Sequence, residues 1–146
     1  MLIGIPASGK STFASTQIPA DYQRISLDVL HTRKHEATVF FDALEKRQNV
    51  VIDNTNVTKA ERERFIVPAK AAGYEITGYY FQSVVPDCLQ RNALRTGKAR
   101  IPDVGVRARA KDLERPSIDE GFDSLYYVKI VDGGFSINEW KSNSEE

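Results

Sequence analysis

The sequence contains a single cysteine, Cys88, among its 146 residues. One thiol cannot form an intrachain disulfide or supply a cysteine-rich zinc site, so neither feature can stabilise this chain. No disulfide partner is expected. No apolar run approaches the roughly 18 residues that a membrane-spanning helix needs, and no secretory signal precedes the first apolar stretch. We therefore expect a cytoplasmic protein that is not attached to a membrane.

The formal net charge is zero, because 20 basic residues balance 20 acidic ones. With 41% hydrophobic residues, the composition is that of an ordinary globular protein, which excludes disordered and collagen-like classes. No Pro/Gly-rich linker, repeat or low-complexity tract interrupts the chain, so we expect one domain over 1–146 with a flexible tail over 141–146.

The charge is unevenly spread, however. Segment 91–115 contains eight basic and three acidic residues and therefore carries a local charge of +5. Overall composition does not indicate a nucleic-acid binder, but this segment can face a polyanion. From charge alone, an ordinary solvated helix face explains it equally well.

Apolar runs alternate with helix-like stretches along the chain. Strands are expected at 1–5, 22–28, 49–53, 74–81 and 124–132, with 135–140 closing the sheet, and helices at 10–17, 36–48, 58–73, 86–95 and 104–115. This order predicts an α/β fold, a three-layer sandwich around a mainly parallel sheet of about five strands. Ligands in such folds gather at the carboxyl ends of the strands, where residues 4–11, Asp28 and residues 53–56 are expected to meet.

The first strand leads into GIPASGKS, residues 4–11, which satisfies the phosphate-binding pattern G-x-x-x-x-G-K-[ST] at every fixed position. Glycines let the backbone turn tightly, so that consecutive N–H groups point at phosphate oxygens, and the following helix adds its positive N-terminus. The lysine supplies charge for the β- and γ-phosphates, and the serine hydroxyl is suited to ligate Mg²⁺. The pattern predicts an ATP and Mg²⁺ site formed by Gly4, Ala7, Ser8, Gly9, Lys10, Ser11 and Thr12.

Three further absences narrow the reaction. The dinucleotide pattern G-x-G-x-x-G is missing, as is the N-K-x-D pattern that reads guanine in GTP switches. Asp53, at the end of the third expected strand, is followed by Asn54 instead of the glutamate that activates water in motor-type ATPases. These absences favour transfer of the phosphoryl group to an acceptor other than water.

Two aspartates are candidates for that chemistry. Asp28, after the second expected strand, can accept the proton of an attacking hydroxyl, although an aspartate there is also a common helix N-cap. Asp53 can assist Mg²⁺ through a water molecule, or can simply be hydrogen-bonded beneath the phosphate loop. Asn56 and His31, near the same sheet edge, are expected to contact the acceptor together with Asp28.

A lid is expected over residues 91–103. Arg91 and Arg95 lie four residues apart on one helix face, directly before the short Thr96–Lys98 loop. A mobile lid of this kind can bring guanidinium groups onto the transferring γ-phosphate. The alternative is an ordinary exposed arginine pair.

Five blocks together resemble a known family. GIPASGKSTF, ISLD, VVIDNTNVTKAERERF, RNALRTGKARIP and EGFDSLYYV occur in this order over nearly the whole chain. They are similar to the polynucleotide 5′-hydroxyl kinase group of P-loop kinases, the kinase domains of end-healing polynucleotide kinase/phosphatases, with zeta-toxin-type kinases as more distant relatives. The resemblance implies ATP and Mg²⁺ as cofactors and delivery of phosphate to a 5′-OH end of DNA or RNA.

Residue by residue, the resemblance implies matches at six positions. Lys10 and Ser11 match the loop lysine and serine, Asp28 the general base, Asp53 the aspartate of the D-x-T-N block, and Arg91 and Arg95 the lid arginines.

The sequence departs from the family pattern three residues after the general base. Some members have an arginine there that contacts the acceptor phosphate, whereas this chain has His31. Acceptor identity therefore stays open between a polynucleotide end and a small hydroxyl compound such as a nucleoside, nucleotide or sugar. A nucleotide-binding regulatory module with little transfer activity is the third alternative.

Overall fold

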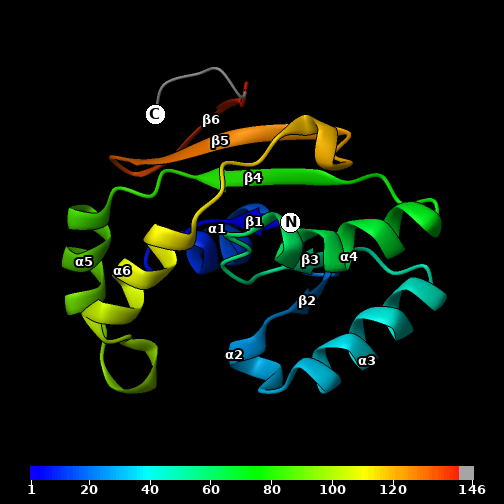
Figure 1. The fold of residues 1–146 in the computed structure, drawn as a ribbon, viewed down its shortest axis with the longest axis horizontal. Coiled ribbons are helices and arrows are strands. Elements are labelled where there is room, and N and C mark those ends of the chain that lie inside the picture. Colours follow the sequence, from blue (N-terminus) through cyan, green and yellow to red (C-terminus); the bar gives the residue numbers. More distant parts are fainter. Residues whose placement is uncertain (142–146) are drawn as a thin grey trace.

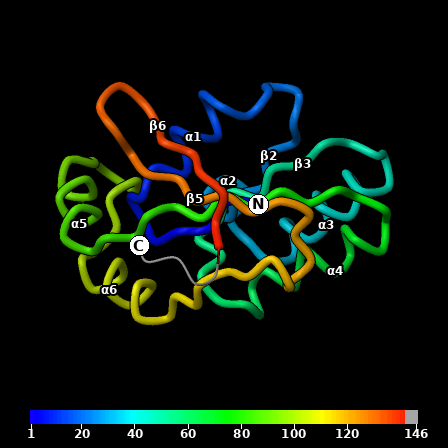
Figure 2. Tube along the Cα trace, turned by 90° about the horizontal axis from the view of Figure 1, so that it is seen from above, coloured from blue at the N-terminus to red at the C-terminus, as the bar shows by residue number. Residues whose placement is uncertain are grey.

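The computed structural model describes residues 1–141. Its strands are β1 (Leu2–Ile3), β2 (Gln23–Ile25), β3 (Val50–Ile52), β4 (Thr77–Phe81), β5 (Ser124–Val131) and β6 (Gly134–Glu139). Its α-helices are α1 (Lys10–Gln17), α2 (Leu27–Leu30), α3 (Arg33–Glu45), α4 (Lys59–Ala71), α5 (Val85–Ala93) and α6 (Asp103–Asp112), and two 3₁₀ turns are η1 (Gly97–Ala99) and η2 (Ile118–Glu120). Helices α5 and α6 lie at one end of the molecule and α3 and α4 at the other (Figures 1 and 2).

The strands form two groups that meet at the phosphate loop. One group has the order β1-β4-β5-β6, with β6 antiparallel to β5, and the other is the parallel pair β2-β3. The groups are joined by the Gly4 amide, which donates to the Thr55 carbonyl at 2.9 Å, and by the Asn56 side-chain amide, which donates to the Leu2 carbonyl at 2.7 Å. The carboxyl ends of β1, β2 and β3 thereby reach the same edge, as the sequence predicts.

Three apolar clusters hold the layers together. On one face, Phe40 of α3 and Phe65 of α4 pack edge to face with ring centroids 5.1 Å apart. On the other face, Phe13 of α1 packs against Phe81 of β4 at 5.2 Å. The third cluster joins Ile5 of the phosphate loop to α5 and α6, so the lid helices are packed directly against the loop they are expected to cover.

The α/β fold with helices on both faces of a mainly parallel sheet is confirmed. Within residues 1–141 there are six strands in place of about five, four in one group and two in the other, and the strand predicted over 22–28 ends at Ile25. Residues 27–30 form α2 instead, which turns Asp28 from a strand residue into a helix residue. Helix α3 begins at Arg33, earlier than predicted, because the Thr32 hydroxyl caps its start by accepting from the His35 amide.

Among the helices of residues 1–141, none is long and apolar enough to cross a membrane. The predicted flexibility of the tail concerns residues 141–146, of which 142–146 lie outside the described residues.

Candidate functional site: a phosphate loop and its neighbours

The phosphate loop is a close-packed turn that needs its two glycines. A β-carbon on Gly4 would lie 2.6 Å from the Ser8 hydroxyl oxygen and 3.0 Å from Cβ of Phe81, distances at which no side chain fits. Gly9 has φ 103°, a left-handed conformation that side chains disfavour, and Lys10 begins α1 directly after it. The turn thus delivers the chain from β1 into the first turn of α1, as the pattern predicts.

Lys10 lies over this turn and is nearly fully buried. Its ammonium nitrogen donates to the Ile5 carbonyl oxygen at 2.9 Å. Burial lowers the pKa of Lys10 to about 8, and the charges of Asp53, Cys88 and Asp28 oppose that shift while Arg95 adds to it. These couplings place both predicted carboxylates and the lid arginine Arg95 within electrostatic reach of the lysine.

Asp28 is exposed on α2. The helix begins at Leu27 with Ser26 in the N-cap position, so Asp28 occupies the first turn and is not the cap. Within residues 1–141, its carboxylate makes no hydrogen bond or ion pair, and its charge raises the pKa of Lys10. A carboxylate with unused acceptor oxygens beside a phosphate loop can accept a proton.

Asp53 is buried and engaged. One of its oxygens accepts from Arg24 of β2, from Nε at 2.9 Å and from Nη2 at 2.6 Å. The Arg24 side chain remains 46% exposed, whereas that of Asp53 is 3% exposed. Asp53 is therefore a carboxylate tied down beside the loop by an arginine that faces solvent.

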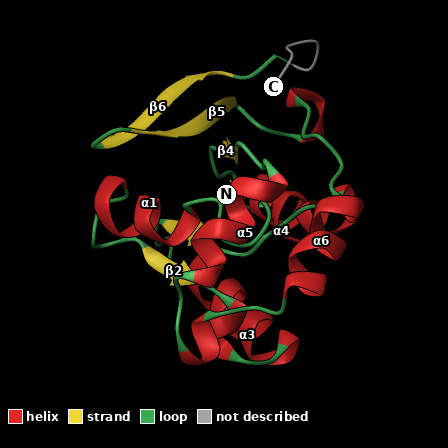
Figure 3. Cartoon of the chain, turned by 90° about the vertical axis from the view of Figure 1, so that its left-hand side faces the viewer, coloured by secondary structure: helices red, strands yellow, loops and turns green. Residues whose placement is uncertain are grey.

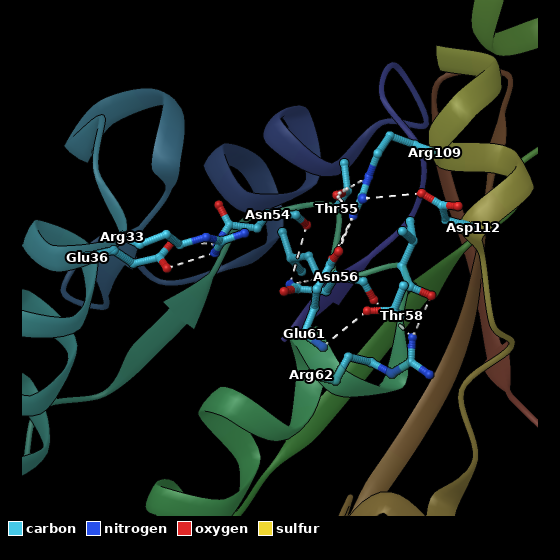
Figure 4. A network of polar contacts seen from close by, with 12 residues as sticks. Arg33, Glu36, Asn54, Thr55, Asn56, Thr58, Glu61, Arg62, Arg109 and Asp112 are labelled. Carbon is cyan, nitrogen blue, oxygen red and sulfur yellow. Dashed lines mark hydrogen bonds and ion pairs between the residues drawn. The ribbon is translucent and has the colours of Figure 1, made fainter. Parts of the chain in front are cut away.

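The loop that follows β3, residues 53–57, is hydrogen-bonded to several elements of the fold, and we call it the hub of the site (Figure 4). Asn54 accepts from the Leu27 amide of α2 at 2.9 Å. The Thr55 hydroxyl accepts from Arg109 of α6 at 2.9 Å, and Arg109 also donates to both oxygens of Glu61. The loop therefore ties the Asp28 helix and the lid side of the molecule to the same short segment.

Asn56 belongs to this hub. It is buried at 2% exposure with φ 48°, and its amide donates to the Leu2 carbonyl of β1. Its own carbonyl accepts from Arg62 at 2.9 Å. These contacts tie β1 to the segment after β3, and the substrate-binding role of Asn56 stays a prediction.

The two lid arginines differ in their surroundings. Arg91 Nε donates to the carbonyl oxygen of Ala7 at 2.7 Å, so Arg91 is hydrogen-bonded to the phosphate loop itself. Arg95 is half-buried and has one long contact, 3.4 Å, to the Ala99 carbonyl. Asn92, fully buried between them, pairs with the backbone of Ile101 and closes the base of the lid loop.

Both arginines line a cavity of about 560 Å³ beside the loop. Its opposite wall is the β5–β6 hairpin, which extends over α1 (Figure 3). Thr12 and Thr16 of α1 form its floor, with Ile130 and Phe135 of the hairpin across from them. The cavity combines guanidinium groups with apolar walls, a lining suited to a planar base attached to phosphates.

The remaining predicted residues lie as follows. Ser8 is buried inside the loop, and Ser11 is exposed in the first turn of α1. His31 is exposed at the end of α2 with φ 69°, three residues from Asp28 on the same turn.

The oxygen donors near the loop suit a transient metal. Within residues 1–141, no group of three or more His, Cys, Asp and Glu side chains is arranged to hold an ion. The donors near the loop are the Ser11 hydroxyl and the carboxylates of Asp28 and Asp53. Mg²⁺ in phosphoryl-transfer sites is held by few protein oxygens, with water and substrate phosphates completing its shell. The donor set therefore fits Mg²⁺ that arrives with a nucleotide better than a resident metal.

The structure also adds residues that sequence patterns did not reveal. Arg24, Glu36 and Arg109 contact the hub from three different elements. Each lies 18 or more residues from its partner, so no local spacing signals the contact. Arg109 belongs to the basic segment 91–115, and its ion pair with Glu61 removes it from the cations that can face a polyanion.

The chain is similar to known proteins over most of its length. Residues 1–116 match the family model described as an AAA domain. Over 132 residues the chain is 31% identical to the bifunctional polynucleotide phosphatase/kinase of Schizosaccharomyces pombe, covering 88% of this chain and 32% of that protein. It is 28% identical over 142 residues to transcription factor bHLH140 of Arabidopsis thaliana, covering 87% of this chain and 15% of that protein. The chain thus spans a third or less of the length of these relatives.

Among solved structures, the fold is similar to that of Chaetomium thermophilum Kti12, crystallised in complex with ADP–AlF₃. The TM-score is 0.60 at 18% identity, over 88% of this chain and 87% of that one. At this identity the similarity establishes the fold alone. The relationship to P-loop kinases that the sequence blocks predict is confirmed by the family match and by the phosphatase/kinase relative.

Proposed function

The chain belongs to the AAA domain family, and from this membership and the geometry of the loop we propose that it is an ATP-dependent kinase that phosphorylates a hydroxyl group. The preferred acceptor in this proposal is the 5′-OH end of a polynucleotide. One observation carries it: the carboxylate of Asp28 has no hydrogen bond or ion pair within residues 1–141, and its helix is bonded through Leu27 to Asn54, next to Thr55, which accepts from Gly4 of the phosphate loop. A proton acceptor and a phosphate-binding cation are thus present on two sides of one site.

The donor is proposed to be ATP. The cavity between Arg91, Arg95 and the β5–β6 hairpin has room for a nucleoside next to the phosphate loop. A structural neighbour with the same fold was crystallised with ADP–AlF₃, which supports a nucleotide at the equivalent loop. Bound Mg²⁺ would neutralise charge on the phosphates, held by the Ser11 hydroxyl and, through water, by Asp28 and Asp53.

Each residue then has a defined task in the transfer. Lys10 and the loop amides bind the phosphates. Asp28 accepts the proton of the acceptor hydroxyl as the new P–O bond forms, while the bond between the γ-phosphorus and the β–γ bridging oxygen breaks and ADP leaves. Arg95, whose guanidinium makes one long contact, is available to turn toward the γ-phosphate, whereas Arg91 stays on the loop. His31, on the same turn as Asp28, lies where it can contact the acceptor.

The acceptor class follows from the relatives and from charge. The S. pombe relative is named as a polynucleotide phosphatase/kinase, and its aligned region includes the basic segment 91–115. Exposed cations on this segment, Lys98, Arg100, Arg107 and Lys111, provide phosphate contacts that do not depend on base sequence.

The test is incubation with γ-labelled ATP, Mg²⁺ and a 5′-OH oligonucleotide, followed by separation of the labelled product. Transfer of label to the oligonucleotide, with a KM for it that rises steeply with added salt, supports the proposal. Good ADP binding without labelled oligonucleotide would overturn the polynucleotide acceptor. Label on a nucleoside or sugar instead, with little salt dependence, would identify a small-molecule kinase, and no label on any hydroxyl acceptor would indicate a regulatory module.

A further inference from the structure

The helix that carries Asp28 is too short and too exposed to fix its own position. Helix α2 has four residues, Leu27–Leu30, and none of them is buried. Helices of this length are unstable in isolation, because few hydrogen bonds repay the cost of ordering the first turn. The Ser26 side chain does not cap it. Leu30 packs against the core, and the orientation of Asp28 depends further on hydrogen bonds made to the ends of α2 from outside.

The first of these contacts comes from Asn54. Its Oδ1 accepts the Leu27 amide hydrogen at 2.9 Å, which satisfies a helix-start N–H that a cap would otherwise satisfy. Its Nδ2 donates to Glu36 Oε2 at 2.7 Å (Figure 4). Because a carboxylate only accepts hydrogen bonds, the Glu36 contact fixes which end of the Asn54 amide faces Leu27.

Glu36 is itself held firmly. Its side chain is 1% exposed on α3, and its other oxygen accepts from Arg33 Nη1 at 2.9 Å. At the far end of α2, His35 Nδ1 lies 3.2 Å from the Leu30 carbonyl oxygen. Both ends of α2 are therefore held by residues of α3, the start through Asn54 bonded to Glu36 and the end directly by His35. Helix α3 in turn packs into the core through Phe40.

We propose that Asn54, oriented by Glu36, is the residue that positions Asp28 for proton transfer. This inference rests on the proposed kinase function. The Glu36 carboxylate accepts from the Asn54 amide, and the Asn54 oxygen accepts from the Leu27 N–H. Leu27 is the residue directly before Asp28. Among residues 1–141, the side chain of Asn54 makes no hydrogen bond to the phosphate loop, so we expect its loss to displace the proton acceptor and leave nucleotide binding in place.

Two substitutions test the chain of hydrogen bonds. Asn54→Ala removes both bonds, and Asn54→Asp keeps the acceptor for Leu27 but sets a second carboxylate against Glu36. The double variant Asn54→Asp/Glu36→Gln restores the pattern with its polarity reversed. A carboxylate at position 54 then accepts from both the Leu27 amide and the new carboxamide at position 36, which still accepts from Arg33. Total charge is unchanged from the wild-type chain.

We expect Asn54→Ala and Asn54→Asp each to lower kcat by about 10²-fold, the loss typical of a reacting group displaced by about 1 Å. The KM for ATP and the Kd for ADP should stay within about twofold, because the loop is intact. The double variant should recover kcat to within about fivefold of wild type. Asn138→Ala, which removes an exposed asparagine of β6, is the matched control.

A second readout does not depend on transfer. Amide hydrogen exchange at Leu27, followed by NMR, should accelerate in Asn54→Ala and return toward the wild-type rate in the double variant, with the amides of α1 unchanged. Absence of transfer by the wild-type chain would overturn the proposed function. Transfer by the wild-type chain that Asn54→Ala leaves unchanged, or a double variant as slow as Asn54→Asp, would overturn this inference alone.

Discussion

Glu120 neutralises a fully buried cation, and replacing it should strongly destabilise the fold. The side chains of Arg62 and Glu120 are 0% and 4% exposed, and two bonds join them, Nε to Oε1 at 2.7 Å and Nη2 to Oε2 at 3.1 Å. Arg62 also donates to the carbonyls of Asn56 and Val57. The pair therefore links α4 and η2 to the loop that organises the site.

The variant Glu120→Gln keeps the shape of the side chain and removes its charge. The new carboxamide still offers one oxygen to Arg62, but its NH₂ group faces guanidinium hydrogens, and the buried positive charge has lost its counter-charge. Removing one partner of a buried pair costs about 3–5 kcal/mol. Because one acceptor is retained, we expect the lower end, about 3 kcal/mol.

The matched control makes the same chemical change at an exposed pair. Asp42 and Lys46 lie one helical turn apart on α3, with side chains 53% and 61% exposed and 3.0 Å between the charged atoms. Solvent screens such pairs, which contribute about 0.3–0.5 kcal/mol. Asp42→Asn should therefore change the free energy of unfolding by less than about 0.5 kcal/mol.

Urea unfolding measures both variants. Trp140, the chain's single tryptophan, is buried and donates its indole N–H to the Pro116 carbonyl at 2.9 Å, so its fluorescence reports loss of the core. With m of about 1–3 kcal/mol/M, a loss of about 3 kcal/mol lowers the midpoint by about 1–3 M. A Glu120→Gln midpoint within experimental error of that of Asp42→Asn would show that the charge of Arg62 does not depend on Glu120, and would refute the reasoning.

Three further predictions concern the reaction. Asp28→Ala should lower kcat by about 10²–10⁴ with ADP affinity little changed, and turnover within a few-fold of wild type would remove Asp28 as the base. Arg95→Ala should lower kcat by about 10³, measured against Arg64→Ala, which removes an exposed arginine of α4, and equal activity of the two variants would contradict the lid role. Burial lowers the pKa of Lys10 to about 8 in the empty protein, and bound phosphates favour the charged amine, so the pKa rises on binding. ADP binding should therefore take up a proton above pH 8 and weaken as pH rises further, while staying flat below about pH 7, as calorimetry in buffers of different ionisation enthalpy will detect.

The parts of this site that the sequence predicts are those encoded by local spacing. The phosphate loop follows from a fixed pattern over residues 4–11, and its steric basis is visible at Gly4, where a side chain has no room. The start of α4 follows from Thr58, whose hydroxyl accepts from the Glu61 amide at 3.2 Å. In a complete capping box the Glu61 carboxylate would accept from the Thr58 amide, but here it contacts Arg109 of α6 instead.

The parts that could not be predicted depend on which distant segments the topology brings together. The strand predicted through Asp28 ends early because Asn54, from the next strand, supplies an acceptor to Leu27 and allows a helical turn to begin there. No spacing within the segment itself encodes that acceptor. The same holds for Arg24, whose register opposite β3 alone brings it to Asp53.

The segment Asp53–Val57 explains why one short block of sequence is so informative about this fold. The side chain of Asp53 contacts β2, that of Asn54 contacts α2 and α3, that of Thr55 contacts α6, and that of Asn56 contacts β1. A substitution at any one of them therefore disturbs a contact that its neighbours within the block do not make. Arg62, itself paired with Glu120, donates to the carbonyls of Asn56 and Val57, so this segment is held by contacts that need no nucleotide. In the proposed reaction, Asp28 would therefore be positioned by the core through this segment, and the mobile contribution would fall to Arg95, the predicted site cation with the weakest contact.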